Sequence, residues 1–154
     1  FIDYKKQGGL YELVMNGISK EELNHLLKLE EIQYILPHIT LLSYLSICQL
    51  NFLYKYAKGL IFPSFREGFG LPPLEAMNHQ VPVITSKLSS LPEICKDAVY
   101  YINPYQITEI TKALIDFQEN KIRESYIKKG NELIKQYSWE QMAKQVLTVY
   151  ESLN

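Results

Sequence analysis

The chain lacks the features that mark a membrane protein, a nucleic-acid-binding protein or a disulfide-rich secreted protein. It contains no apolar run near the roughly 20 residues that a membrane-spanning helix needs. Its 16 basic and 17 acidic residues nearly cancel, so it has no excess of basic charge for binding nucleic acid. Its two cysteines, Cys48 and Cys95, match no metal-ligand spacing. We therefore expect reduced thiols and a cytoplasmic location, although the sequence leaves a disulfide between the two open.

The chain also lacks internal repeats and low-complexity tracts. Its first residues have the wrong order of charge and hydrophobicity for a signal peptide. It begins at Phe1 and not at a methionine, which suggests a piece of a longer protein. What is present is an ordinary globular composition, 47% hydrophobic and 21% charged, in 154 residues. Length and composition together predict one domain.

Residues 60–86 hold the most informative pattern. The apolar run 60–62 ends at a proline and predicts a strand buried on both faces. A loop with two glycines follows at 67–70, and Pro72 and Pro73 stand where a helix would begin. A second buried strand is predicted at 81–85. A glycine loop that leads from a strand into a helix presents amide groups and a partial positive charge, which favours an anion.

The rest of the chain alternates in the same way. Further strands are predicted at 10–15, 39–44 and 99–102, and helices at 19–31, 48–57 and 89–95 and in three segments from Thr108 onward. Ser19 with Glu22, and Ser46 with Gln49, have the spacing of a capping box. The alternation predicts an α/β fold: a Rossmann-like, mainly parallel sheet with helices on both faces and a helical C-terminal tail.

Two glutamates flank the glycine loop. A glycosidase pair would hold its carboxyl groups about 5 Å apart in retaining enzymes. Glu67 precedes the loop and Glu75 lies within the next helix, and eight residues of helix alone would span about 12 Å. We therefore favour contacts to different parts of one elongated ligand, such as a nucleotide diphosphate sugar. In the simpler alternative Glu75 only favours the positive helix end and Glu67 is solvated.

The segment PSFREGFGLPPLEAM at 63–77, with VPVITS at 81–86 and SSLPEI at 89–94, resembles the signature of retaining glycosyltransferases of family 4 (group 1). This family has the GT-B architecture, in which two Rossmann-like domains face each other across a cleft. Residues 11–17, 39–57 and 137–140 are similar to further blocks of the family, so the resemblance covers most of the chain. It implies the C-terminal, donor-binding domain.

The resemblance assigns roles to residues by position. It implies Glu67 near the reacting centre, the backbone of Gly68, Phe69, Gly70 and Leu71 against the sugar and diphosphate, Glu75 on the ribose hydroxyls, and Tyr44 and Ser46 beside the base. Transfer in this family retains configuration through attack on the face that the leaving phosphate occupies. No covalent nucleophile, metal or other cofactor is expected.

The chain departs from the family in three places. The arginine and lysine that neutralise the diphosphate, and the first, central strand of the domain, are both expected before Phe1. Either this is a piece of a longer protein, or another chain or segment fills that position. The third departure is Gln80, where the family has glycine, so Gln80 either strains a left-handed turn by about 1 kcal/mol or changes its path.

Neither His25 nor His79 is predicted to bind a metal. His25 has no second ligand nearby and is interpreted as a surface or partly buried side chain. His79 lies close to the glycine loop and could contact a ligand, but a histidine on the surface of a helix end is the favoured interpretation.

The leading hypothesis is the donor-binding half of a retaining hexosyltransferase for a mannose- or glucose-type sugar. Its partners would be a nucleotide-sugar donor, a glycan or lipid-linked acceptor and a missing N-terminal GT-B domain, without which it would be inactive. That half could also provide peripheral contact with the inner face of the cell membrane, as in cell-envelope polysaccharide assembly. The alternatives are an inactive stand-alone nucleotide-binding or interaction module, and an unrelated α/β domain.

Overall fold

Two parallel sheets with surrounding helices make up the computed structural model, which describes residues 1–26 and 29–153. The strands are β1 (Leu13–Asn16), β2 (Ile39–Leu42), β3 (Leu60–Phe62), β4 (Val83–Ser86) and β5 (Tyr100–Ile102). The helices are α1 (Ile2–Lys6), α2 (Lys20–Leu26), α3 (Leu29–Ile35), the 3-10 turn η1 (Leu36–His38), α4 (Ile47–Tyr56), α5 (Leu71–Asn78), α6 (Leu91–Cys95), α7 (Ile107–Asp116), α8 (Asn120–Ile134) and α9 (Trp139–Glu151). Within this described part, no helix is both long and apolar enough to span a membrane.

The predicted α/β alternation is confirmed, with small shifts of the element ends. Strand 60–62 is found as predicted, while β1 begins three residues later than the predicted strand 10–15. The predicted helix 19–31 is represented by α2 and by the start of α3, and its residues 27–28 lie outside the described part of the chain. The predicted serine caps form: Ser19 with Glu22 and Ser46 with Gln49 each make both bonds of a capping box.

The three-stranded sheet has the order β3-β4-β5, and all its strands are parallel. Because neighbouring residues of a strand point to opposite faces, Val83 and Ile84 belong to different apolar clusters. The first cluster packs α4, α5 and α6 on one face, and the second packs α7 and Phe117 on the other. Residues of α8 reach both clusters, Ile122 and Tyr126 near its start and Leu133 at its end.

The two predicted buried strands of this sheet differ in their burial. All four residues of β4 are buried, as predicted, but all three residues of β3 are only partly buried. The strand at 60–62 is therefore confirmed, but its predicted burial on both faces is wrong. The reason is position: β4 has a strand on each side, whereas β3 is at the edge of the sheet that the described residues form.

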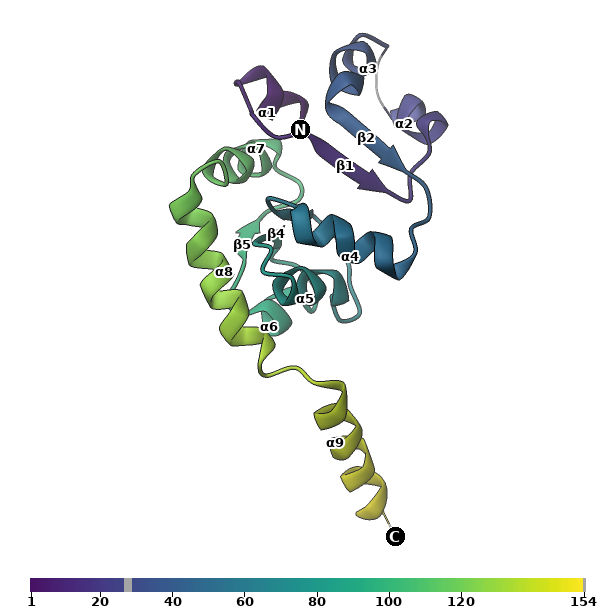
Figure 1. The fold of residues 1–154 in the computed structure, drawn as a ribbon, viewed down its shortest axis with the longest axis vertical. Helices are drawn as coiled ribbons and strands as arrows, with labels where there is room; N and C mark the ends of the chain where they lie inside the picture. The colour runs from purple at the N-terminus through teal and green to yellow at the C-terminus, as the bar shows by residue number, and fades with distance from the viewer. Residues whose placement is uncertain (27–28, 154) are drawn as a thin grey trace.

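The second sheet contains only β1 and β2, paired in parallel from Leu13 with Ile39 to Asn16 with Leu42. Figure 1 shows it with α2 and α3 at one end of the molecule, with α4 running between it and α5. The phenol of Tyr11, just before β1, donates a 3.1 Å hydrogen bond to the carbonyl of Phe117 and accepts one from Arg123 at the start of α8. A Cβ on Gly59, just before β3, would lie 3.1 Å from the ring of the same Phe117. The amino ends of the two sheets therefore meet at Phe117.

Helix α9 projects beyond the body at the other end of the molecule (Figure 1). Ser138 caps it by accepting a hydrogen bond from the Gln141 amide. None of its residues is buried, and Trp139 is 71% exposed. Its stability within this chain therefore comes from its own hydrogen bonds and cap and not from packing.

The turn after α5 decides between the two alternatives for Gln80. Its φ is +60°, so the left-handed turn is kept and a residue with a side chain occupies it. The cost of such a conformation for a residue other than glycine is about 1 kcal/mol. The turn delivers the chain directly into Val81 and β4, whose burial offsets that strain.

Candidate functional site

The motif residues gather at the carboxyl edge of the three-stranded sheet. The loop 63–70 follows β3 and leads into α5, and the loop 87–90 follows β4 and leads into α6. Since β3 and β4 are neighbouring parallel strands, both loops emerge at the same edge. In an open α/β sheet, this edge is where ligands bind.

Glu67 lies partly buried in the first of these loops. Its Oε1 accepts a 3.0 Å hydrogen bond from the hydroxyl of Ser64. The same hydroxyl lies 3.2 Å from the carbonyl of Arg66, but it has one proton, and the shorter bond to the charged oxygen is the stronger one. Glu67 is therefore oriented by its own loop. The simpler alternative, in which Glu67 is only a solvated loop residue, does not account for this hydrogen bond.

Serines at the end of β4 and in the second loop hold the first loop by its backbone. The Ser86 hydroxyl donates to the carbonyl of Ser64 at 2.5 Å, and the Ser89 hydroxyl donates to the carbonyl of Glu67 at 2.7 Å. The Ser90 hydroxyl lies 3.2 Å from the same Glu67 carbonyl and 3.1 Å from that of Phe69. We call Ser86, Ser89 and Ser90 the serine brace. It connects the loop that carries Glu67 to the buried strand β4.

The two glycines of the loop are not equivalent. Gly70 caps α5 with φ +101°, and a Cβ there would lie 2.8 Å from a methyl group of Leu91. Gly68 has ordinary backbone angles, and an added Cβ would meet nothing within 4 Å. Gly70 is therefore required by the fold, whereas the protein itself leaves room for a side chain at Gly68.

The helix N-terminus behind this loop provides fewer amide donors than most. Pro72 and Pro73 follow Leu71, the first residue of α5, and proline has no N–H group. The partial positive charge of the helix end remains, but the amides available for an anion are those of residues 68–71. These are the residues that the sequence resemblance assigned to the sugar and diphosphate, and that contact stays a prediction.

Glu75 lies one turn further along α5 and is exposed. Its Oε2 accepts a 3.2 Å hydrogen bond from the phenol of Tyr54, a buried residue of α4. Burial and the neighbouring carboxylate raise the pKa of Tyr54 well above its usual value, so the phenol keeps its proton and always donates. Glu75 is thus held by a second helix, which the sequence did not indicate.

Tyr44 and Ser46 lie on the connection from β2 to α4. The ring of Tyr44 is 98% exposed. The Ser46 hydroxyl is occupied by the capping box, since it donates to Oε1 of Gln49 at 2.9 Å and accepts from the Gln49 amide. Ser46 therefore has a clear structural role, and contact of either residue with a nucleotide base stays a prediction.

His79 ends α5 and is partly exposed. Its ring stacks on that of Tyr54 with a centroid distance of 5.5 Å and an interplanar angle of 15°. In the part of the chain that the structure describes, no three or more His, Cys, Asp and Glu side chains are placed to hold a metal ion. Cys48 is exposed, whereas Cys95 is buried, and burial raises the pKa of its thiol to about 11.

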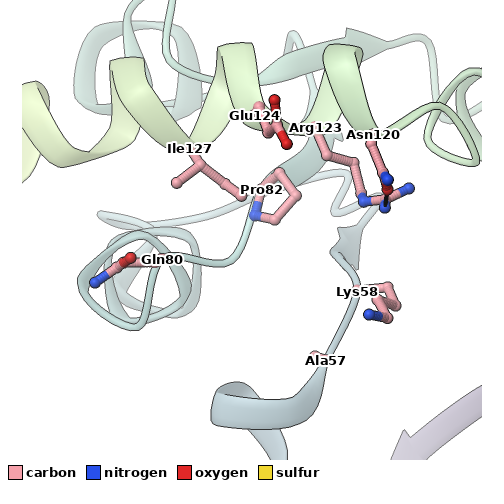
Figure 2. Close-up of a pocket in the computed structure, with 8 residues that line it drawn as sticks. All are labelled: Ala57, Lys58, Gln80, Pro82, Asn120, Arg123, Glu124 and Ile127. Carbon is pink, nitrogen blue, oxygen red and sulfur yellow. Dashed lines mark hydrogen bonds between the residues drawn. The ribbon is translucent and has the colours of Figure 1, made fainter.

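A hollow of about 240 Å³ lies at the opposite edge of the sheet. Figure 2 shows Lys58 and Pro82, which precede β3 and β4, facing Arg123, Glu124 and Ile127 of α8. The guanidinium of Arg123 already binds the phenol of Tyr11, the carbonyl of Phe117 and the side chain of Asn120. Because these bonds fasten the residues before β1 to α8, we assign the hollow a structural role.

Glu67, the glycine loop and Glu75 thus all belong to the connection from β3 through α5. Tyr44 lies apart from them, on the connection that follows β2 of the other sheet. Sequence reasoning missed Tyr54 and the serine brace as partners of the two glutamates. Tyr54 lies within the family-like block 39–57, and the serine brace lies within the blocks 81–86 and 89–94. The resemblance therefore marked these segments without indicating which contacts they make.

Comparisons with known proteins show the family and the fold of this chain. Residues 3–135 match the family model of the glycosyl transferases group 1. The chain is 35% identical over 144 residues to the O-antigen chain mannosyltransferase B of Escherichia coli, covering 93% of this chain and 38% of that protein.

Solved structures show the same fold. Sucrose-phosphate synthase from Thermosynechococcus elongatus superposes with a TM-score of 0.82 at 21% identity, over 99% of this chain and 41% of that one. The Anabaena protein HepE, solved in complex with UDP-glucose, has a TM-score of 0.80 at 16% identity over 98% of this chain and 44% of its own. The chain therefore spans about two fifths of the length of these proteins. Their GT-B fold covers it almost from end to end, and by its family match this chain belongs to the glycosyl transferases of group 1.

Proposed function

We propose that this chain is the donor-binding half of a retaining glycosyltransferase. The reaction moves a hexose of the mannose or glucose type from a nucleotide diphosphate sugar to a glycan or lipid-linked acceptor. The observation that carries the proposal is the braced loop between β3 and α5, which holds Glu67 at one end and leads to Glu75 at the other. The Escherichia coli relative, a mannosyltransferase of O-antigen chains, favours mannose as the hexose.

The loop and its glutamates suit the three parts of such a donor. The amides of residues 68–71 and the positive end of α5 favour the diphosphate. The carboxylate of Glu75 accepts hydrogen bonds from the ribose hydroxyls, as acidic residues do in dinucleotide sites. Glu67 contacts the sugar next to the bond that breaks.

In the proposed reaction the bond from the anomeric carbon to the diphosphate oxygen breaks. A bond from that carbon to the acceptor hydroxyl oxygen forms on the same face, and the hydroxyl proton passes to the departing phosphate oxygen. Glu67, oriented by Ser64, stabilises the positive charge that develops on the sugar, and the loop amides stabilise the leaving group. We propose that no metal ion takes part, so transfer should continue in the presence of a chelator.

The rest of the protein supplies the acceptor site in this proposal. We also propose that a strand from the rest of the protein lies between β1 and β3, whose amino ends meet at Phe117. Both are parallel strands with an unpaired edge among the described residues, and such an edge presents N–H and C=O groups that another strand can pair with. The Leu60 amide already bonds the carbonyl of Pro82 on the β4 side, and amides of neighbouring strand residues point to opposite edges. Hydrogen exchange at the Ile61 amide should then be much slower in the complete protein than in segment 1–154. Equal rates in the two would exclude this strand.

The function is tested by calorimetry on the complete protein with GDP-, UDP- and ADP-linked mannose and glucose. One of these donors should bind. Glu75→Ala should lower the affinity for that donor roughly tenfold, since hydrogen bonds to a charged group contribute about 1.5–3 kcal/mol. Glu132→Ala is the matched control, because Glu132 is also an exposed helical glutamate but lies on α8, paired with Lys135.

The products distinguish the remaining alternatives. Transfer with the anomeric configuration of the donor kept, seen by NMR, is the expected result, and inversion would contradict the retaining mechanism. Donor binding by the complete protein without transfer to any glycan or lipid-linked acceptor would instead identify an inactive nucleotide-binding module. Binding of none of the donors would overturn the proposed function as a whole.

A further inference from the structure

Tyr54 connects the interior of the protein to the proposed ribose contact. Its side chain is buried, with 8% exposed, and it packs in the apolar cluster beneath α5. Only its hydroxyl reaches a polar partner, the Oε2 atom of Glu75, at 3.2 Å. Glu75 itself is exposed. A buried donor on one helix therefore holds an exposed carboxylate on another.

The direction of this hydrogen bond is fixed. Burial and the nearby Glu75 carboxylate raise the pKa of the Tyr54 phenol well above its usual value. The phenol therefore stays protonated at neutral pH, and it has one proton to donate. That proton occupies one lone-pair position on the Glu75 carboxylate, which leaves the other positions of its two oxygens for the hydroxyls of a ligand.

His79 packs against the ring of Tyr54. It stands four residues after Glu75 and ends the same helix, so both contact Tyr54 from one face of α5. The two rings stack with a centroid distance of 5.5 Å and an angle of 15° between their planes. Tyr54 is thus placed between the apolar cluster and His79, and its hydroxyl has little freedom to leave Glu75.

An exposed glutamate ordinarily samples many rotamers, and ordering one of them on binding reduces the affinity. Two neighbouring hydroxyls donate to a carboxylate only when its plane faces them both. A carboxylate that is already oriented by a permanent donor avoids that ordering cost, which is the general effect of preorganisation.

We propose that Tyr54 is a positioning residue that orients the Glu75 carboxylate for the vicinal hydroxyls of a ribose. The inference rests on the proposed function, because it takes the ribose assignment of Glu75 from it. Tyr54 touches Glu75 and not the donor. It therefore acts on the affinity for nucleotides that carry both hydroxyls, and not on the sugar or the diphosphate.

The test is Tyr54→Phe in the complete protein. This variant keeps the ring, its packing and the stacking on His79, and removes only the hydroxyl, so it should fold; thermal unfolding checks this. Tyr100→Phe is the matched control, because the Tyr100 phenol donates a 2.7 Å hydrogen bond to Asp116, a carboxylate remote from the loop. Calorimetry measures the affinity of each variant for GDP, UDP, ADP and the 2′-deoxy and 3′-deoxy forms of the nucleotide that binds best.

We expect Tyr54→Phe to lower the affinity for the ribonucleotide about fivefold to tenfold, since the hydrogen bond that it removes is to a charged group. The affinity for the deoxy forms should fall less than about twofold, because a deoxyribose no longer donates two hydroxyl hydrogen bonds to the Glu75 carboxylate. Tyr100→Phe should change neither affinity. The discrimination between ribose and deoxyribose should therefore shrink in Tyr54→Phe alone.

The other outcomes separate this inference from the proposed function. If Glu75→Ala weakens the ribonucleotide but Tyr54→Phe does not, the positioning role is wrong and the ribose assignment stands. Equal weakening of ribo and deoxy forms by Tyr54→Phe would show an effect on the fold, and would also overturn the inference. If Glu75→Ala changes nothing, the ribose assignment is wrong and this inference fails with it. If no nucleotide binds, the proposed function itself fails.

Discussion

Strands β4 and β1 have the same length and both pair in parallel, yet β4 is enclosed and β1 is not. All four residues of β4 are buried, whereas β1 alternates between partly buried and exposed residues. Their sequences would suggest the reverse, because VITS in β4 has two apolar residues and LVMN in β1 has three. Burial here follows from the number of neighbours: β4 has a strand on each side and a cluster on each face, while β1 pairs only with β2 among the described residues.

The same difference separates the parts of the predicted site. Glu67 and the glycine loop are connected through the serine brace to the enclosed strand β4. Tyr44 follows β2 on the less covered sheet, and its ring is 98% exposed. Side chains on well-covered elements are held in one geometry, so the enclosed sheet carries the part of the site that is already in place.

The largest expected effect comes from removing side-chain volume in equivalent strands of the two sheets. Ile84→Ala in β4 should lower the free energy of unfolding by about 2–4 kcal/mol, because Ile84 is 1% exposed and a cavity would remain. Val14→Ala in β1 should cost about 1 kcal/mol or less, since Val14 is 46% exposed. Urea unfolding of segment 1–154 measures both. Equal losses would mean that the two sheets are equally well packed.

An intermediate effect is expected within the loop of the enclosed sheet. Gly70→Ala should lower the free energy of unfolding by about 2 kcal/mol, because its φ of +101° and the contact with Leu91 exclude a side chain. Gly68→Ala should change it by less than about 0.5 kcal/mol, since its Cβ would meet no atom of the protein.

The same glycine pair also tests the binding site. If the donor approaches the backbone at residue 68, Gly68→Ala should weaken donor binding by the complete protein without destabilising it. A Gly68→Ala variant that binds the donor normally would remove Gly68 from the site and leave Gly70 as a structural glycine only.

The smallest expected effect is on the least covered element, α9. Trp139 is the only tryptophan of the sequence and is 71% exposed. The fluorescence maximum of segment 1–154 should therefore lie near that of a fully exposed indole and shift little on unfolding. Trp139→Ala should change the free energy of unfolding by about 0.5 kcal/mol or less. A marked red shift on unfolding would show that α9 is covered in solution.

Patterns that depend on neighbours in the sequence were predicted well. The capping boxes at Ser19 and Ser46 need residues three positions apart, and both form. The two ends of strand 60–62 also followed from local signals, as did the start of α5 at Leu71, next to Pro72 and Pro73. Local hydrogen-bonding groups and fixed backbone angles act within a few residues, so the sequence displays them directly.

Contacts between distant segments were not predicted. The bond from Tyr54 to Glu75 spans 21 residues, and that from Ser89 to the Glu67 carbonyl spans 22. Gly68 and Gly70 look alike in the sequence, and only the position of Leu91 separates them. The partial burial of β3 depends on which strands lie beside it.

The sequence by itself determined the succession of strands and helices, the family and the loop with its two glutamates, because each depends on residues close together in the chain. The tertiary structure alone decided which glycine is essential, that serines and a buried tyrosine hold the two glutamates, and that one sheet is enclosed while the other stays open at its edge. Those properties arise where segments far apart in the chain pack against each other, and residue order alone does not specify that packing.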